Sequence, residues 1–246
     1  MRLADGTAIE NPTRYEELLA GSLSELRDHP AIDVSRDTLV VQSDAVGADG
    51  MAAAELAAES MAAGAMIADL GDVVVDPAIA ESAPRFSRIA CRWRASDEST
   101  GLGGEFRVPY FFAALFEPAP PLAWEGSPDD ERELLAQFRE IDGHPRAGTG
   151  LVAAVRVEAN RTPLEIWVWD ARIGPLQMEL DYLGYLEALA LTKGTFGWQY
   201  LFTHVSLASN DFHHTAKGLT TMLRVFPELF PDHDYTPLRE RLEARL

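Results

Sequence analysis

The chain has 246 residues, of which 47% are apolar, and it carries a formal net charge of −18. This apolar fraction is ordinary for a globular protein and supplies a sizeable core, so it excludes disorder of the whole chain. A charge this negative repels phosphate backbones and anionic lipids, which disfavours nucleic acid and membranes as partners and favours a neutral or basic protein.

Two features of the sequence bear on where the protein works. The one cysteine, Cys91, excludes an internal disulfide framework and fits a reducing compartment. Residues 1–12 lack the apolar core of a signal peptide, and the alanine-rich segment 51–70 carries acidic residues that are costly in lipid. We therefore expect a cytoplasmic protein that does not enter a membrane.

The N-terminal third begins with a well-marked helix. Asn11 as the cap and Pro12 at the first helical position predict a helix that ends near Pro30. The following residues predict a short strand at 39–41, an alanine-rich helix from about 50 to 69, and a buried strand or extended segment at 72–76.

A strand with two different faces is predicted between Arg85 and Ala95. Ile89, Cys91 and Trp93 alternate with other residues, which is the period-two pattern of a half-buried strand. We expect the Cys91 thiol to be buried and inert. The only basic concentration of this acidic chain is Arg85, Arg88, Arg92 and Arg94, and alternation places the last three on the opposite, outer face. These arginines either dock a partner or a phosphate group, or pair with the plentiful acids.

A glycine-rich turn follows this strand. Residues 99–104, STGLGG, lack the Gly-Lys-Ser/Thr ending of a phosphate loop and are not followed by a helix. We therefore predict a hairpin turn, with residues 105–108 as the second arm. An aromatic run, 110–116, comes next.

Residues 118–128, PAPPLAWEGSP, form the most linker-like stretch of the chain. The tryptophan in it, Trp124, indicates a loop pinned to a surface. We expect a single α+β unit over residues 1–246, and we keep open a division into an N-terminal region, 1–117, and a C-terminal region, 126–246.

A helix is predicted directly after this stretch. Ser127 as the N-cap, Pro128 and three acidic residues are typical of a helix start. We expect its apolar stripe to extend from Leu134 through Phe138 and Ile141, and the helix to end at a glycine, Gly143.

Strands and a further helix follow. Segments 151–157 and 164–169 predict a strand pair, 177–180 a third short strand, and 182–192 a helix that ends before Gly194. The pattern of antiparallel hairpins with flanking helices predicts an α+β fold with a mainly antiparallel sheet.

Two tryptophans share one face of the second of these strands. Alternation puts Trp167 and Trp169 on the face opposite to Ile166 and Val168. Such a pair is either core beneath a helix or an interface anchor. We therefore treat both tryptophans as candidate partner-binding residues.

The C-terminal residues predict two helices and contain a candidate metal site. Ser209 or Asn210 caps a helix that ends at Pro227, and a last helix covers 237–246. The candidate ligands are His204, Asp211, His213 and His233, with His214, Asp232 and Asp234 close by in sequence. Neighbouring side chains on a helix point about 100° apart, and neither an HExxH nor a CxxC element is present. A solvated helix start and an acidic loop are the simpler interpretation.

Residues 151–195 resemble the SMI1/KNR4, or SUKH, superfamily. The resemblance consists of the strand pair LVAAVRVEA and LEIWVWDAR, the turn IGPLQMELD and the helix YLGYLEALALTKG. It implies an α+β fold with a mainly antiparallel sheet and a binding role, since many bacterial members neutralise a partner toxin. Several such toxins are nucleases, which an acidic surface can engage by mimicking nucleic acid. The family's N-terminal pattern, a helix leading to a tyrosine and an Asn-Gly turn, is missing from this chain.

The leading hypothesis is a non-enzymatic, acidic protein-binding module, such as a bacterial immunity or regulatory protein, without a cofactor. One alternative is a metal-dependent hydrolase that uses the C-terminal histidines and acids. Another is a structural protein that self-associates through the aromatic strand. The sequence has no Gly-x-Ser-x-Gly elbow, the commonest hydrolase signature.

Overall fold

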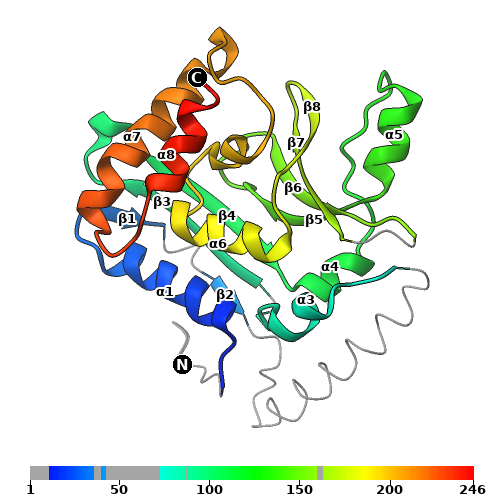
Figure 1. The fold of residues 1–246 in the computed structure, drawn as a ribbon, viewed down its shortest axis with the longest axis horizontal. Coiled ribbons are helices and arrows are strands. Elements are labelled where there is room, and N and C mark those ends of the chain that lie inside the picture. Colours follow the sequence, from blue (N-terminus) through cyan, green and yellow to red (C-terminus); the bar gives the residue numbers. More distant parts are fainter. Residues whose placement is uncertain (1–10, 36–39, 43–72, 87, 160–162) are drawn as a thin grey trace.

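The computed structural model describes residues 11–35, 40–42, 73–86, 88–159 and 163–246 (Figure 1). The predicted alanine-rich helix at 50–69 lies outside the described residues. The fold combines two antiparallel sheets with flanking helices, which confirms the predicted α+β class. In the described part of the chain, none of the helices has the length and apolar character needed to span a bilayer.

The first helix, α1 (Arg14–Asp28), begins later than predicted because a different residue caps it. The Thr13 hydroxyl accepts a hydrogen bond from the Glu16 backbone N–H at 3.2 Å. In return, the Glu16 carboxylate accepts from the Thr13 N–H at 2.8 Å. This reciprocal capping satisfies two backbone donors that a helix start otherwise leaves unpaired, so Thr13 and not Asn11 is the cap.

The first sheet is built around β3 (Arg88–Ala95), as the alternating pattern predicted. One edge of β3 pairs with β4 (Gly103–Pro109), through a 3₁₀ turn at Glu98–Thr100 and Gly101 in the left-handed conformation. This confirms the predicted hairpin. The other edge pairs with β1 (Ile32–Val34) and β2 (Val40–Gln42) at its two ends.

One short helix precedes this hairpin in the chain, and another follows it. Residues 73–76 belong to no strand, and the Asp76 carboxylate caps α3 (Pro77–Ser82). The predicted aromatic run forms α4 (Phe111–Phe116), whose inner aromatic residues are buried.

The helix predicted between Ser127 and Gly143 is confirmed in its first half, and the prediction is wrong for its second half. Helix α5 (Asp129–Ala136) ends early, and Phe138 and Ile141 belong to strand β5 (Phe138–Gly143). A spacing of three places two residues on one side of a helix but on opposite faces of a strand. Accordingly, Phe138 packs beneath α5 while Ile141 enters the main core.

The predicted serine cap of α5 is also wrong. The cap position is Pro128, which makes no side-chain hydrogen bond there. The Ser127 hydroxyl instead donates to the Glu131 carboxylate at 2.9 Å.

The second sheet has the strand order β5-β6-β7-β8, all antiparallel. The predicted pair corresponds to β6 (Leu151–Arg156) and β7 (Glu165–Asp170). The third strand, β8 (Gly174–Gln177), lies three residues earlier than predicted because Gly174 adopts φ 86° and allows a tight return after β7.

Helix α6 (Tyr182–Thr192) has the predicted bounds and is capped by the Asp181 side chain. Its C-terminus closes through Lys193 and Gly194, both with positive φ. A 3₁₀ segment, Trp198–Phe202, leads on toward the last helices.

The C-terminal helices depart from the predicted boundaries. A 3₁₀ turn, Asn210–Phe212, precedes α7 (His213–Leu229), and neither Ser209 nor Asn210 provides a side-chain cap. Helix α7 continues through Pro227, although a proline removes one helical hydrogen bond. The carbonyl that loses this donor, Leu223 O, accepts from the Arg239 guanidinium of α8 (Thr236–Glu243) at 3.2 Å.

Both halves of the chain contribute to one buried cluster. Trp93 of β3 contacts Phe226 of α7, with ring centroids 6.0 Å apart. Asp142 of β5 links the two sheets, because its carboxylate accepts from the backbone N–H of Arg107 on β4 and from the hydroxyl of Tyr185 on α6, each at 2.7 Å. In Figure 1, α6, α7 and α8 lie on one side of the second sheet and α5 on the other.

Candidate functional site

The predicted outer-face arginines lie at different places along β3. Arg92 and Arg94 line an open hollow of roughly 630 Å³, together with Asp33, Glu98 and Phe196. We call these five residues the arginine hollow. Arg88, at the start of the strand, does not line it.

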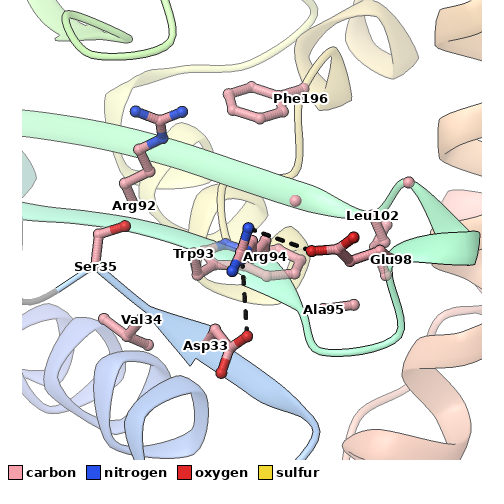
Figure 2. Close-up of a pocket in the computed structure, with 12 residues that line it drawn as sticks. Asp33, Val34, Ser35, Arg92, Trp93, Arg94, Ala95, Glu98, Leu102 and Phe196 are labelled. Carbon is pink, nitrogen blue, oxygen red and sulfur yellow. Dashed lines mark ion pairs between the residues drawn. The ribbon is translucent and has the colours of Figure 1, made fainter.

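Charges of both signs meet in the arginine hollow (Figure 2). The Arg94 guanidinium lies 3.7 Å from the Asp33 carboxylate and 3.6 Å from that of Glu98, and all three side chains are largely exposed. Arg92 lies 4.0 Å from Glu105, whose carboxylate is buried and accepts the backbone N–H groups of a neighbouring loop. The two Arg94 pairs are long and exposed and therefore weak, while the Arg92 pair is at the 4.0 Å limit, so a ligand carboxylate can add to the contacts of both guanidinium groups.

Phe196 reaches the hollow through backbone pairing that requires a glycine. Its N–H donates to Gly103 O on β4 at 3.1 Å, next to a bridge between Gly104 and Thr195. A Cβ on Gly104 would lie 2.4 Å from the carbonyl oxygen of Gly194, so only glycine allows this approach. Phe196 was not anticipated from the sequence; its flanking glycines, Gly194 and Gly197, were the available signal.

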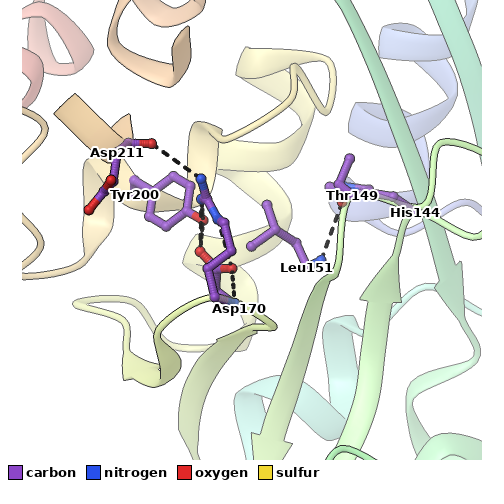
Figure 3. A network of polar contacts seen from close by, with 7 residues as sticks. His144, Thr149, Leu151, Asp170, Tyr200 and Asp211 are labelled. Carbon is purple, nitrogen blue, oxygen red and sulfur yellow. Dashed lines mark hydrogen bonds and ion pairs between the residues drawn. The ribbon is translucent and has the colours of Figure 1, made fainter. Parts of the chain in front are cut away.

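A second hollow, of roughly 340 Å³, shares Phe196 and residues 101–103 with the first. At its edge Asp170, at the end of β7, accepts from the Tyr200 hydroxyl at 2.5 Å and from the Arg172 guanidinium at 2.9 Å (Figure 3). Burial alone would raise the pKa of Asp170, but these hydrogen bonds outweigh it and hold the pKa below its usual value. Arg172 is therefore engaged by its own chain and serves to join β7 to the segment around Tyr200.

A buried histidine lies behind this second hollow. His144 Nδ1 lies 2.7 Å from the Thr149 hydroxyl (Figure 3). The His144 ring packs edge-on against Phe196. Burial lowers the pKa of His144 to about 4, so the imidazole is neutral at pH 7. A histidine beside a hydroxyl is the geometry of a general base, but a pKa this low makes a weak one.

The residues predicted as metal ligands do not meet. Within the ranges that the structure describes, no group of three His, Cys, Asp or Glu side chains is arranged to hold a metal ion. His204 is exposed and lies 3.6 Å from Glu179, while Asp211 contributes its backbone carbonyl to Arg172. His213 is exposed beside His214 at the start of α7. His233 lies 2.9 Å from Glu25 of α1.

His233 belongs instead to a half-buried ionic cluster that the sequence did not reveal. Glu25 of α1 pairs both with His233 and with Lys193, which is 1% exposed. Burial lowers the pKa of Lys193, and pairing with Glu25 opposes this. The cluster ties α1, the end of α6 and the loop before α8 together. The one sequence signal was the rarity of lysine, which occurs only twice in the chain.

Trp167 and Trp169 lie on the outer face of β7, half-buried against a small cluster beneath α5. The Trp167 ring packs 5.7 Å from that of Phe138, and its indole N–H donates to Glu165. Leu135 of α5 covers this cluster and is 2% exposed. The pair thus supports α5 from below.

Trp124 is the tryptophan that reaches solvent, contrary to the expectation that it pins its loop to a surface. It is 71% exposed, more than any other large hydrophobic residue that the structure describes. Its ring lies over the Cα of Gly126, where a Cβ would come within 2.2 Å of it. Ser127 holds the turn: its N–H donates to Trp124 O at 3.0 Å, and its hydroxyl accepts from the Trp124 N–H at 3.3 Å.

Acidic side chains follow this tryptophan in the sequence, in the turn and in the first turns of α5. We define the Trp124 surface as Trp124 with four exposed acids: Glu125, Asp129, Asp130 and Glu133. In the described part of the chain, none of these four carboxylates forms an ion pair. An exposed indole ring next to carboxylates without ion pairs, with Arg132 as the only cation among residues 124–133, is available for contact with a basic surface.

Comparison with known proteins gives no match to a family model, a curated protein or a solved structure.

Proposed function

We propose that the protein is a non-enzymatic binding module that engages a basic protein partner through the Trp124 surface. The observation that carries this proposal is the 71% exposure of Trp124 on a turn that hydrogen bonds hold in place. Exposing a large apolar ring to water is unfavourable in free energy, and burial at an interface would recover this cost. Tryptophan is among the residues that dominate binding energy at protein interfaces.

Charge favours a basic partner. The chain carries −18 overall, and the four acids of the Trp124 surface add to this field where the indole is exposed. Complementary charge speeds the encounter, while burial of the ring at the centre of the contact slows dissociation. The resemblance of residues 151–195 to the SUKH superfamily adds a partner class: a toxin, such as a nuclease, whose nucleic-acid site is basic. In this proposal the protein acts in the cytoplasm as an immunity or regulatory factor.

The test compares baits in a pull-down at low salt from the native cytoplasm, followed by calorimetry with the purified partner. We expect the wild-type chain to retain one stoichiometric protein that salt elutes. We expect Trp124→Ala to weaken its binding by about 10- to 100-fold, typical of a central aromatic anchor. Replacing Asp129, Asp130 and Glu133 by their amides should mainly slow association and reduce the salt dependence.

Matched controls separate the site from general charge or hydrophobicity. Leu246→Ala removes another exposed apolar side chain, and amides at Glu228, Glu240 and Glu243 remove the same charge from α7 and α8. These controls should bind like the wild type. Retention of the partner by Trp124→Ala at unchanged affinity, or the absence of any stoichiometric partner, would refute the proposal.

A further inference from the structure

The arginine hollow lies on a different element from the Trp124 surface, and the binding function proposed above does not use it. Its volume, roughly 630 Å³, is in the range of small-molecule sites. Arg92 and Phe196 stand on the same side of the β3–β4 hairpin (Figure 2). The hollow therefore has a cationic wall and an aromatic wall.

The floor between these walls is kept open by a glycine. Gly103 pairs with Arg94 across the hairpin, so a side chain at 103 would share the outer face with the arginines. A Cβ there would lie 3.0 Å from Trp93 O and 3.7 Å from the Arg94 Cβ. Any larger residue would thus take up space beside the guanidinium groups, which Gly103 leaves without a side chain.

The charges in the hollow restrict which anion fits. Guanidinium groups bind carboxylates and phosphates in a planar, two-point manner and also stack on aromatic rings. A phosphate dianion would meet Asp33 and Glu98 as well as the field of a strongly acidic chain. A carboxylate carries a single negative charge, so it suffers this repulsion least.

We propose that the arginine hollow binds a carboxylate attached to an aromatic residue, with the carboxylate at Arg92 and the ring against Phe196. Arg94 is held by Asp33 and Glu98 and completes the cationic wall. Two sources share this chemistry: a free aromatic acid, and the C-terminal residue of a peptide or protein.

The experiment uses the full chain and N-acetyl-L-phenylalanine as the probe, followed by saturation-transfer NMR and calorimetry. We expect a dissociation constant of about 1 mM or below. N-acetyl-L-phenylalaninamide, which lacks the carboxylate, should bind at least about 10-fold more weakly, since a charge-assisted contact is lost. A pentapeptide ending in phenylalanine separates the sources: tighter binding than the probe identifies a chain terminus, and weaker binding a free acid.

Variants locate the binding. Arg92→Gln should reduce affinity by about 10-fold, and Phe196→Leu by several-fold while keeping an apolar side chain. Arg88→Gln is the matched control, because Arg88 lies on the same strand but outside the hollow. Equal binding of acid and amide, no binding of either, an equal loss in Arg88→Gln, or tighter binding of phenyl phosphate would each overturn the assignment.

Discussion

The outer faces of β3 and β7 follow the same alternating sequence pattern, but the first is open to solvent and the second is covered by a helix. Each strand alternates buried apolar residues with outward ones, and each turns its apolar face to the shared core. The outward residues differ: β3 carries arginines, and β7 carries Trp167 and Trp169. The arginine face stays open and forms a hollow, whereas the tryptophan face is covered by α5.

This difference shows what an outward face requires. A guanidinium group is well solvated, so the face of β3 needs no cover and can be kept for a ligand. Two indole rings on one face expose a large apolar area, which favours packing a further helix over them. Covering them places α5 at the edge of the molecule, and the turn that leads into α5 exposes Trp124.

The largest effect is expected from a change at Asp142, because this residue links the two sheets. Burial raises the pKa of Asp142 to about 7, although hydrogen bonds from Arg107, Gly143 and Tyr185 oppose the rise. The folded protein therefore holds a proton there that the unfolded chain releases near pH 4. Its contribution to stability is complete below that pH and is lost as pH rises through 7, by up to about 4 kcal/mol. Asp142→Asn should remove this slope, measured by urea unfolding between pH 4.5 and 7.5.

A second buried aspartate serves as the control for this pH dependence. Asp170 also accepts a tyrosine hydroxyl, but Arg172 keeps its pKa below the usual value. Its stabilisation is present above pH 4 and is lost only in acid. The difference in unfolding free energy between Asp170→Asn and the wild type should thus be flat over the same range. A flat difference for Asp142→Asn as well would show that Asp142 is ionised in the folded protein.

An intermediate effect is expected from a change on one face only. Trp167→Ala removes the half-buried ring against Phe138 and should lower the free energy of unfolding by about 1–2 kcal/mol. Hydrogen exchange should accelerate in α5 and not in β3. Trp124→Ala deletes the same side chain from an exposed position and should change stability by less than about 0.5 kcal/mol. Equal losses in the two variants would mean that α5 does not depend on the β7 face.

The smallest effect is expected on the open face. Arg94→Gln breaks two ion pairs of 3.6 and 3.7 Å between exposed side chains, so the unfolding free energy should change by less than about 0.5 kcal/mol. Arg85→Gln is the contrast, because its guanidinium pairs at 2.8 Å with Glu16, which is fully buried, and its loss should cost roughly 2 kcal/mol or more. A large loss in Arg94→Gln would show that the open face contributes to folding and is not reserved for binding.

Local rules were sufficient where a segment's conformation depends on its own residues. The alternation in 88–95 and the turn at 99–104 predicted the first hairpin, and the bounds of α6 followed from its apolar pattern and the glycine behind it. The burial of Cys91 followed from the same alternation, and burial raises the pKa of its thiol to about 12.

The predictions were wrong where a contact with a distant residue outweighs the conformation that the local sequence favours. Pro227 remains inside α7 because Arg239, twelve residues on, satisfies the carbonyl that the proline leaves without a donor. Residues 138–141 fit a helical stripe equally well, but pairing with β6 makes them a strand. His233 is adjacent in sequence to other candidate ligands, yet it pairs with Glu25 on the first helix.

The sequence by itself determined the α+β class, the inward face of each main strand and the excess of negative charge, because these depend on composition and on spacing within a segment. Only the tertiary structure decided which outward residues meet a ligand or a partner. Phe196 joins Arg92 through the pairing of distant segments, and Trp124 is exposed because α5 packs through other side chains. Such placements depend on contacts between residues far apart in the chain, which a local pattern does not encode.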